Sequence, residues 1–334
     1  MDAVVIGSGP NGLVAANLLA DEGWSVTVLE SQPQPGGAAR TLELIEPGFF
    51  NDICSAFYPF GVASPIFSSL ALERYGLKWR HAPLVLAHPS EDGTCPVLSR
   101  DLDETATSLA ANGEVGDGDA WRRLFGRWQK TRSGLLALMF SPMPPVKGAV
   151  QLLAALGPRK LPRFLRFMIL PVRRLGEEEF GADAGRRLLT GTALHADLAP
   201  ETPMSGFYGW IMCALGQEVG FPVPEGGAGG ITKALINRLT ERGGQVHCGE
   251  RVVEVVVRDG LACGVRVEGG DEIAARRAIL ADVSAPALYR DLLSPDHLPP
   301  ALIEDLDRFQ WDNATVKVDW NLEGPIPWNA EPAR

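Results

Sequence analysis

The sequence predicts an α/β fold in which a parallel sheet is interrupted by a largely helical region. Three observations predict it: a strand, a glycine-rich loop and a helix open the chain, strand patterns return late, and helical patterns broken by prolines fill the middle. A chain of 334 residues that is 46% hydrophobic is too long for one minimal domain and too apolar for a disordered chain. We expect one discontinuous domain at 1–75 and 221–290, a helical region at 76–220, and an incomplete further segment at 291–334.

The first thirty residues form the most informative unit. Residues 3–6 are a short apolar run with β-branched side chains, typical of a strand buried on both faces. The run ends in the loop Gly7-Ser-Gly-Pro-Asn-Gly12, and a pattern of small residues then predicts a helix that stops at Gly23. A second strand follows at 25–29, with Glu30 at its end.

This order of strand, G-x-G-x-x-G loop, helix, strand and acid is the pattern of a Rossmann-like dinucleotide-binding unit. Gly7 permits the tight turn, Gly9 lets the backbone approach a pyrophosphate, and Gly12 allows the helix to pack closely on the strand. The helix N-terminus offers free N–H groups and the positive end of its dipole to the phosphates. Glu30 is placed to accept hydrogen bonds from the adenosine ribose hydroxyls. A simple glycine-rich turn would leave Glu30 unexplained.

A second glycine motif follows soon after Glu30. The doublet Gly36-Gly37 and the nearby Arg40 fit a second backbone approach to the same ligand, with the guanidinium near the pyrophosphate or the ribityl chain. An ordinary Pro-Gly turn would explain the doublet alone. The combination with Glu30 favours FAD over NAD as the dinucleotide.

The strand pattern returns after residue 221. The glycine-rich stretch 226–230 has no apolar strand before it and no strand-terminal acid after it, so we predict no separate NAD(P)H domain. A helix follows and stops at Gly243-Gly244. Next, 251–258 and 261–267 predict a β-hairpin around a type I′ turn at Asp259-Gly260. A third strand near 272–276 and the apolar run 278–281 lead back to the sheet.

The charge is distributed unevenly along the chain. The net charge of −10 disfavours nucleic acid as a partner, because the surface on average repels phosphate. Residues 120–176, however, contain twelve Lys or Arg and no Asp or Glu. Such a segment can contact anionic lipid or another protein; alternatively, its bases neutralise the acidic remainder. The helical middle also contains two stretches rich in apolar and aromatic residues, 161–170 and 207–215. They fit either a cap over an apolar pocket or the packed core of a helical unit.

The cysteines and histidines give no sign of a metal or disulfide site. The five cysteines include no C-x-x-C pair, and no histidine stands at metal-ligand spacing, so we predict a reduced, cytoplasmic chain without a metal site. The uncharged run 3–20 lacks a basic leader and is broken by glycines, which argues against a signal peptide or a membrane span. Peripheral membrane contact through 120–176 stays open as an alternative.

Two stretches carry a resemblance to a known family. VVIGSGPNGLVAANLLADEGWSVTVLE at 4–30 and PGGAART at 35–41 resemble the phytoene desaturase and amine oxidase branch of FAD-dependent oxidoreductases. The stretch 47–79 is similar to the phytoene dehydrogenase-like subgroup that includes pyridine nucleotide-disulfide oxidoreductase domain-containing protein 2. The resemblance implies a glutathione reductase-type FAD-binding domain interrupted by a helical substrate or cap region. It also implies that a valine at the start of the first returning strand contacts the adenine through its backbone; Val252 matches, with Val253 as the alternative.

The expected cofactor is FAD, and the expected chemistry follows from it. The predicted cofactor-binding residues are Gly7, Gly9, Pro10, Asn11, Gly12, Glu30, Gly36, Gly37, Arg40 and Val252.

We expect hydride transfer from a hydrophobic small-molecule substrate to the flavin, with desaturation of a C–C bond and reoxidation by oxygen or a quinone. An amine oxidase and a noncatalytic flavin-binding or membrane-associated module are the alternatives. The catalytic residues are unknown, and Asn51, Asp52 and Tyr58 are the first to test.

The end of the chain gives two further expectations. Residues 315–322 alternate apolar and polar side chains, which predicts a half-buried strand. The resemblance implies that relatives continue through a C-terminal glycine-rich motif that contacts the flavin. We therefore expect this chain to bind FAD more weakly than a longer relative.

Overall fold

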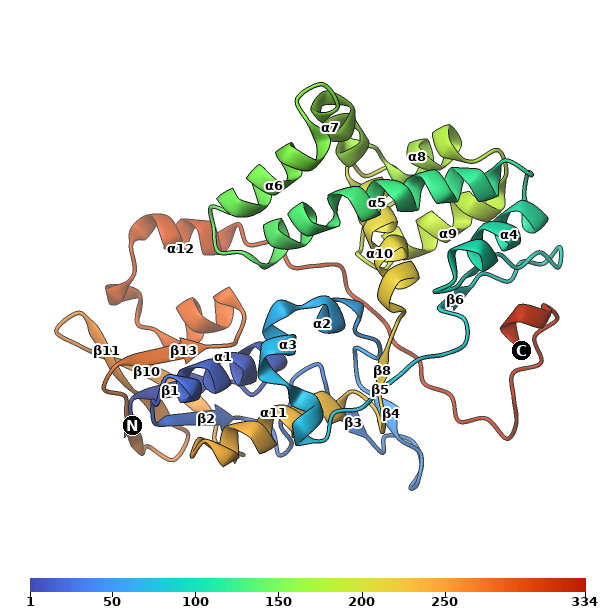
Figure 1. The fold of residues 1–334 in the computed structure, drawn as a ribbon. Helices are drawn as coiled ribbons and strands as arrows, with labels where there is room; N and C mark the ends of the chain where they lie inside the picture. The colour runs from blue at the N-terminus through green and yellow to red at the C-terminus, as the bar shows by residue number, and fades with distance from the viewer. The chain divides into compact units, whose positions relative to one another are not determined.

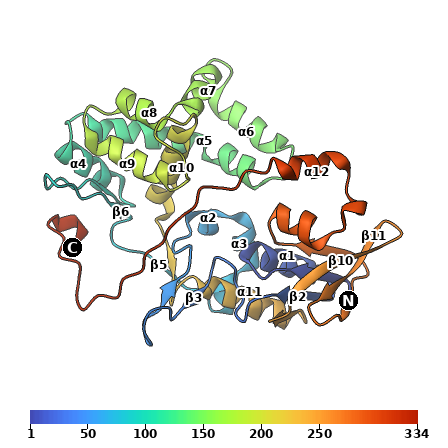
Figure 2. The same cartoon turned by 180° about the vertical axis from the view of Figure 1, so that it is seen from behind.

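The structure is a computed structural model that describes residues 1–334, and its internal contacts divide the chain into two compact units. Unit 1 consists of 1–57, 66–80 and 223–321, and unit 2 consists of 58–65, 81–222 and 322–334. Figure 1 traces the chain through both units, and Figure 2 shows the same ribbon from behind. Unit 1 is therefore assembled from distant parts of the sequence.

A four-stranded parallel sheet forms the centre of unit 1. Its strand order is β13 (Ala278–Ala281), β1 (Ala3–Ile6), β2 (Val26–Glu30) and β9 (Gln245–Cys248). Every neighbouring pair is parallel, so the carboxyl ends of the strands lie at one edge. This sheet confirms the predicted α/β fold class. The sequence did not predict β9, whose mostly exposed residues lack an apolar run.

Two different layers cover this sheet. Helices α1 (Pro10–Asp21) and α11 (Gly229–Glu241) pack against each other and against the sheet. The antiparallel strands β10 (Val252–Arg258), β11 (Leu261–Val267) and β12 (Glu272–Ala274) lie on the opposite side, as Figures 1 and 2 show.

The β10–β11 hairpin and the return to β13 match the sequence predictions. Asp259 and Gly260 have φ values of +51° and +76°, as a type I′ turn requires. Side chains alternate between the two faces of a strand, so every second side chain of these strands points into a core between the two sheets. This core consists of Val4, Ile6, Leu29, Val252, Val255, Val265, Val267, Ala275 and Leu292.

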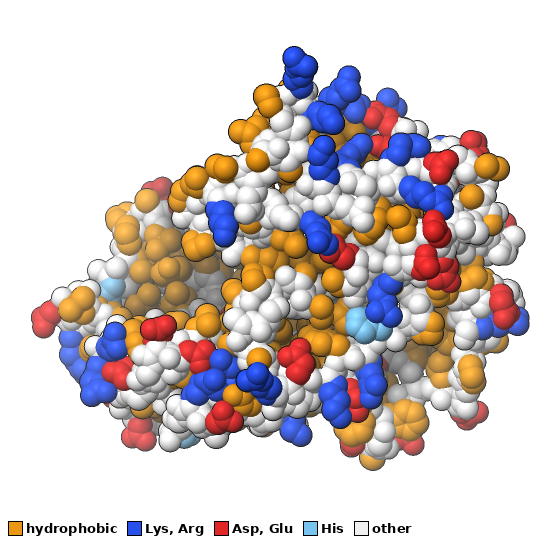
Figure 3. All heavy atoms as spheres, viewed as in Figure 1, with side chains coloured by type: hydrophobic (Ala, Val, Ile, Leu, Met, Phe, Trp, Pro, Cys, Tyr) orange, Lys and Arg blue, Asp and Glu red, His pale blue; other side chains and the backbone are white.

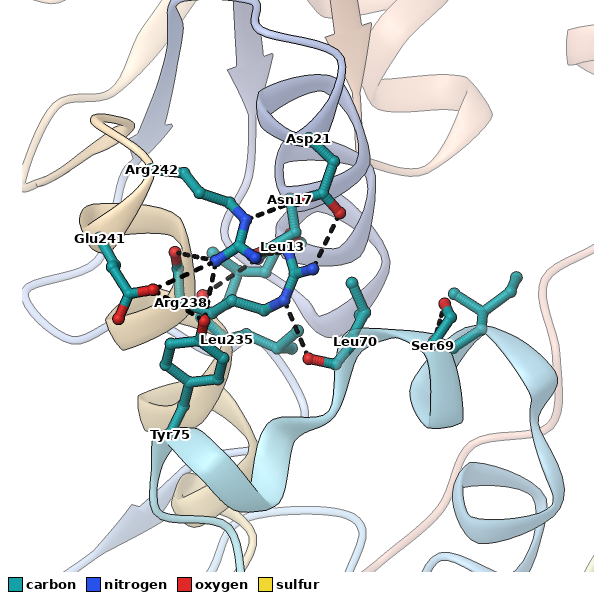
Figure 4. Close-up of polar contacts among 11 residues, drawn as sticks. Leu13, Asn17, Asp21, Ser69, Leu70, Tyr75, Leu235, Arg238, Glu241 and Arg242 are labelled. Carbon is teal, nitrogen blue, oxygen red and sulfur yellow. Dashed lines mark hydrogen bonds and ion pairs between the residues drawn. The ribbon is translucent and has the colours of Figure 1, made fainter.

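A buried arginine joins α1, α11 and the segment that precedes η1 (Leu72–Tyr75). Arg238 donates from Nε to the Leu70 carbonyl at 2.9 Å, from Nη1 to Asn17 Oδ1 at 3.1 Å, and from Nη2 to Asp21 Oδ2 at 2.8 Å (Figure 4). Arg242 also binds Asp21, at 2.5 Å. Burial alone would raise the pKa of Asp21, but the hydrogen bonds from both arginines outweigh it and lower that pKa. The network fixes α1 against α11.

Short elements complete unit 1. They are β3 (Thr41–Leu42), β4 (Asn51–Asp52), α3 (Pro65–Leu70), β5 (Trp79–Arg80), β8 (Val223–Pro224), η2 (Ala287–Leu292), η3 (Pro295–His297) and α12 (Pro300–Asp307). Strand β3 pairs with β4, and β5 pairs with β8, both antiparallel. The predicted strand at 315–322 is wrong: those residues are not hydrogen-bonded into a sheet, and Val316, Val318 and Trp320 are exposed. Alternation cannot form a strand without a partner strand.

Unit 2 is mainly helical, as the proline-punctuated patterns predict. Its helices are α2 (Pro59–Ala63), α4 (Leu102–Asn112), α5 (Asp117–Phe140), α6 (Val146–Leu156), α7 (Leu161–Ile169), α8 (Val172–Glu179), α9 (Asp183–Leu194), α10 (Ser205–Val219) and η4 (Glu331–Ala333). A hairpin of β6 (Leu86–Ala87) and β7 (Val97–Leu98) accompanies them. No helix in the structure combines the length and apolar character that crossing a membrane requires.

The aromatic residues of the middle region form the packed core of unit 2. Helix α10 is buried along most of its length, and Trp210 lies 4.9 Å from Phe167, ring centre to ring centre. The indole N–H groups are satisfied: Trp210 donates to the Leu124 carbonyl at 3.0 Å, and Trp121 donates to Gln217 Oε1 at 2.9 Å. Of the two interpretations of these apolar stretches, the structure supports the packed core.

Candidate dinucleotide site

The glycine-rich loop after β1 makes a turn that leaves no room for side chains. Gly7 has φ = +95°, and a Cβ there would lie 2.6 Å from the Asp282 carbonyl oxygen. A Cβ on Gly9 would lie 2.6 Å from Asp282 Oδ2, and one on Gly12 would lie 2.5 Å from the Gly7 carbonyl oxygen. Gly7 and Gly12 are therefore required by their contacts with backbone atoms, whereas a methyl group at Gly9 would displace the end of the Asp282 side chain. Pro10 and Asn11 form the first turn of α1.

Glu30 lies at the carboxyl end of β2, and its carboxylate is held from several sides. Glu30 is buried; its Oε2 accepts hydrogen bonds from Ser8 N at 3.0 Å and Ser8 Oγ at 2.6 Å, and its Oε1 accepts from Gln32 N at 2.8 Å. Burial alone would raise the pKa of Glu30, but the hydrogen bonds from Ser8, Gln32 and Ser31 outweigh it and lower that pKa. Glu30 is therefore held ionised, as a hydrogen-bond acceptor should be.

The second glycine motif approaches the first through Ser8. The Ser8 hydroxyl accepts a hydrogen bond from Gly36 N at 3.1 Å, while it donates to Glu30. Gly37 has φ = +53°, and a Cβ there would lie 3.1 Å from Gly9 Cα. The two glycine motifs thus pack backbone against backbone, beside the acid that ends β2.

A cavity of about 360 Å³ opens at this edge of the sheet. It brings together five of the predicted cofactor-binding residues: Gly7, Gly9, Glu30, Gly37 and Val252. Val252 is the first residue of β10 and is buried, whereas its alternative Val253 is exposed and is not among the lining residues. The full lining is Ile6, Gly7, Gly9, Leu29, Glu30, Ser31, Gly37, Glu250, Arg251, Val252, Asp282, Val283, Ala287, Asp291 and Leu292.

Arg40 lies apart from this cavity. Its Nε donates to the Gly37 carbonyl at 2.8 Å, which ties it to the second glycine motif. It lines a different cavity, of about 290 Å³, together with Thr41, Thr232 and Lys233. The structure thus places Arg40 next to the glycine doublet but not in the cavity that contains Glu30.

Sequence reasoning missed two residues that organise the site, Ser8 and Asp282. Asp282 follows β13 directly, and its Oδ2 accepts a 2.8 Å hydrogen bond from Gly12 N at the start of α1. Asp282, like Glu30, is an acidic residue directly after an apolar strand, so the same sequence pattern would have identified it. Ser8 occupies a variable position of the fingerprint, so spacing alone gave no signal for it.

The residues chosen for a first catalytic test have different surroundings. Asp52 Oδ1 accepts hydrogen bonds from Thr41 Oγ1 at 2.6 Å and from Ala228 N at 2.8 Å, which gives this side chain a role in joining loops. Asn51 Oδ1 is buried without a hydrogen-bond partner. Tyr58 belongs to unit 2, where its backbone N–H binds the Pro222 carbonyl at 2.9 Å.

The site fits the adenosine end of a dinucleotide in shape and in donor chemistry. The backbone is bare at Gly7, Gly9 and Gly37. The Glu30 carboxylate already accepts four hydrogen bonds, and the longest, 3.4 Å from Ser31 Oγ, is the one that another donor would most easily replace. The charges are less favourable to a pyrophosphate, because four acids and one base line the cavity: Glu30, Glu250, Asp282 and Asp291 against Arg251. The positive groups at this cavity are Arg251 and the N-terminus of α1, where Asp282 already accepts a hydrogen bond from Gly12 N.

These features define a dinucleotide-binding α/β protein, and comparison with known proteins gives the family. The family model described as "Flavin containing amine oxidoreductase" matches residues 11–320, so the chain belongs to that family. The resemblance to the amine oxidase branch is thereby confirmed, and so is FAD as the cofactor.

Named relatives agree with the predicted subgroup. The chain is 28% identical over 351 residues to pyridine nucleotide-disulfide oxidoreductase domain-containing protein 2 of Mus musculus, a match covering 95% of this chain and 59% of the relative. It is 30% identical over 306 residues to the zeta-carotene-forming phytoene desaturase of Myxococcus xanthus, covering 87% of this chain and 55% of the relative. The chain thus spans little more than half the length of these relatives.

A solved structure supports the fold. A putrescine oxidase variant superposes with a TM-score of 0.59 at 17% identity, over 92% of this chain and 62% of that one. At this identity the similarity concerns the fold alone, and it agrees with the Rossmann-like architecture of unit 1.

Proposed function

We propose that the protein containing this chain is an FAD-dependent oxidoreductase that dehydrogenates a hydrophobic small molecule and forms a C=C bond. The family match supports the oxidoreductase class, and relatives named as a phytoene desaturase and hydroxyneurosporene desaturases support the desaturase chemistry and the apolar substrate. Amine oxidation is the alternative within the same family.

One observation carries the proposal: the cavity at the carboxyl edge of the parallel sheet joins both glycine motifs, Glu30 and Val252. In α/β proteins, ligands bind outside the carboxyl ends of the strands. We propose that FAD is held here by Gly7, Gly9, Pro10, Asn11, Gly12, Glu30, Gly36, Gly37, Arg40 and Val252. The assignment of 1–75 and 221–290 as its domain, with 76–220 as the substrate or cap region, belongs to the same proposal.

The residues of this chain would bind and orient the cofactor. FAD, when bound, supplies a two-electron acceptor for the hydride that leaves a substrate C–H bond. Ionised Glu30 would accept hydrogen bonds from ribose hydroxyls, and the bare glycine backbone would let α1 approach the pyrophosphate. We assign no catalytic side chain, because none of the described contacts places one against a reacting atom.

The visible spectrum of the purified chain tests this function. We expect a yellow protein with flavin absorbance that bleaches under anaerobic conditions when an apolar polyene substrate is added. Glu30→Gln should lower flavin content, whereas Glu22→Gln, an exposed residue after α1, should not. A colourless protein that also fails to take up added FAD would contradict the proposal, and bleaching by amines alone would favour amine oxidation.

We also propose that the basic segment 120–176 contacts an anionic membrane surface. Such a contact would bring the protein to an apolar substrate dissolved in lipid. A cytoplasmic location, proposed from the cysteine pattern, is compatible with the five free thiols of the structure.

A further inference from the structure

Half of the basic residues in the segment 120–176 have no acidic partner. Six form ion pairs with carboxylates: Arg122, Arg127, Arg132, Arg166, Arg173 and Arg174. The other six form none: Arg123, Lys130, Lys147, Arg159, Lys160 and Arg163. The alternative that these bases neutralise acidic residues therefore explains the six ion-paired bases but not the six unpaired ones.

Four of the unpaired bases surround one cavity. The cavity has a volume of about 340 Å³ and lies in unit 2, between α5 and the start of α7. Arg123 and Lys130 line it from α5, and Lys160 and Arg163 line it from the other wall. No acidic residue lines it; the remaining lining residues are Gly126, Arg127, Thr131, Leu156, Phe164 and Phe167. The cavity combines a strongly positive wall with an apolar floor.

Arg127 adds a fifth cation to the lining of this cavity, beside its apolar floor. Its Nη2 lies 3.4 Å from Glu179 Oε1, and its Cζ lies 4.2 Å from the centre of the Phe167 ring. Its Nη1 is buried and has no hydrogen-bond partner. Because Nη1 is inaccessible to solvent, Arg127 offers a ligand in the cavity its positive charge, not this N–H group.

We propose that this cavity binds the phosphate group of an anionic phospholipid. Several converging cations, with guanidinium groups among them, match the charge and the several acceptor oxygens of a phosphate better than those of a single carboxylate.

A lipid is favoured over a soluble phosphate because the same part of unit 2 exposes apolar side chains. Leu165 and Ile169 are exposed on α7, and Val146, Val150 and Leu153 are exposed on α6. Figure 3 shows basic side chains gathered over the end of unit 2 that carries α5, α6 and α7, with hydrophobic side chains beside them. Apolar insertion and headgroup binding together make a stable peripheral contact.

This inference rests on the proposed membrane contact and names the cavity that makes it. The test therefore distinguishes failure of the cavity from failure of the membrane contact. Flotation of the purified chain with vesicles of phosphatidylcholine, with and without about 30% phosphatidylglycerol, measures lipid binding. The pocket variant is Lys130→Gln with Arg163→Gln. The matched control is Lys147→Gln with Arg159→Gln. It also removes one lysine and one arginine from the segment 120–176, but neither of them lines the cavity.

We expect binding only to the anionic vesicles. Both variants should bind more weakly, because each base near the surface contributes about 1 kcal/mol, but the pocket variant should be weakened about tenfold more than the control. Sodium phosphate should release the protein more effectively than sodium chloride of equal ionic strength. Equal weakening of both variants would overturn the pocket and leave a diffuse membrane contact. No binding to any vesicle would overturn both proposals, and pocket-dependent binding of inorganic phosphate alone would identify a soluble phosphate as the ligand instead.

Discussion

The Ser8 hydroxyl donates a 2.6 Å hydrogen bond to the carboxylate of Glu30, 22 residues further along the chain. The same hydroxyl accepts a hydrogen bond from Gly36 N at 3.1 Å. One buried side chain therefore connects the first glycine motif, the strand-terminal acid and the second glycine motif. Ser8 thus sets the relative positions of the two glycine loops that line the cavity proposed for the cofactor.

Ser8→Ala should lower the free energy of unfolding by about 2 kcal/mol, because a hydrogen bond to a buried carboxylate contributes about 1.5–3 kcal/mol. FAD affinity should fall as well, since Glu30 and Gly36 lose their common partner. Chemical denaturation and a flavin titration measure the two effects. Ser31→Ala is the control for the free energy of unfolding, because the Ser31 hydroxyl, 3.4 Å from Glu30 Oε1, makes a longer and weaker hydrogen bond than Ser8. Equal effects of both substitutions would contradict the connecting role of Ser8.

Glu30 should make the stability of the flavin-free chain depend on pH in the acidic range. Its pKa in the folded protein is lowered below the ordinary value of 4.5, so folding favours the ionised form. This stabilisation is fully present above about pH 4.5 and is lost as the pH falls through the lowered pKa. Denaturation curves of the wild type and Glu30→Gln should therefore differ near neutral pH and converge in acid. A difference that grows in acid would contradict this assignment.

Asp282→Asn should have opposite effects on the stability of the fold and on FAD affinity. The asparagine can still accept the hydrogen bond from Gly12 N, but the loss of charge at the N-terminus of α1 should cost the flavin-free chain about 0.5–1 kcal/mol. FAD binding should tighten several-fold, because a carboxylate at this position repels a pyrophosphate. Asp291→Asn is the control, because Asp291 lines the same cavity and its substitution also removes one negative charge there. Weaker FAD binding by Asp282→Asn would show that the carboxylate contributes to the flavin site.

Gly12→Ala should destabilise the fold by about 2 kcal/mol, a typical cost of overpacking. The added methyl group would lie 2.5 Å from the Gly7 carbonyl oxygen, a backbone atom that cannot rotate away. Gly126→Ala, within α5, is the control because nothing lies within 4 Å of the position that its methyl group would take. That control should be neutral or stabilising by about 0.5–1 kcal/mol. Thermal unfolding compares the two, and a harmless Gly12→Ala would refute the close packing of α1 on the glycine loop that begins at Gly7.

Arg238→Met should lower the free energy of unfolding by about 3 kcal/mol, because it leaves Asp21, Asn17 and the Leu70 carbonyl without their shared buried donor. Arg242→Met removes a more exposed partner of the same Asp21 and should cost about 1 kcal/mol. The two substitutions should be non-additive, since both act on one carboxylate. Additive effects in a double-mutant cycle would contradict a single network.

The local sequence determined the elements whose signals lie within a few residues. The apolar run 3–6, the glycine spacing and the acid at Glu30 predicted the β1–α1–β2 unit, and Asp259-Gly260 predicted the β10–β11 turn. These succeeded because strand burial, helix starts and positive φ angles depend on nearby residues. The glycines and Glu30 that we propose for cofactor binding were identified from the same local signals.

The tertiary structure decided everything that depends on a distant partner. Residues 315–322 have the alternation of a strand but no strand beside them, whereas the weak pattern of β9 becomes a strand because β2 offers its edge. Asp282 meets Gly12 across 270 residues, and the unpaired bases converge only when α5 packs near α7. Spacing along a chain encodes local conformation, but hydrogen-bond partners and clustered charges depend on which segments folding brings together.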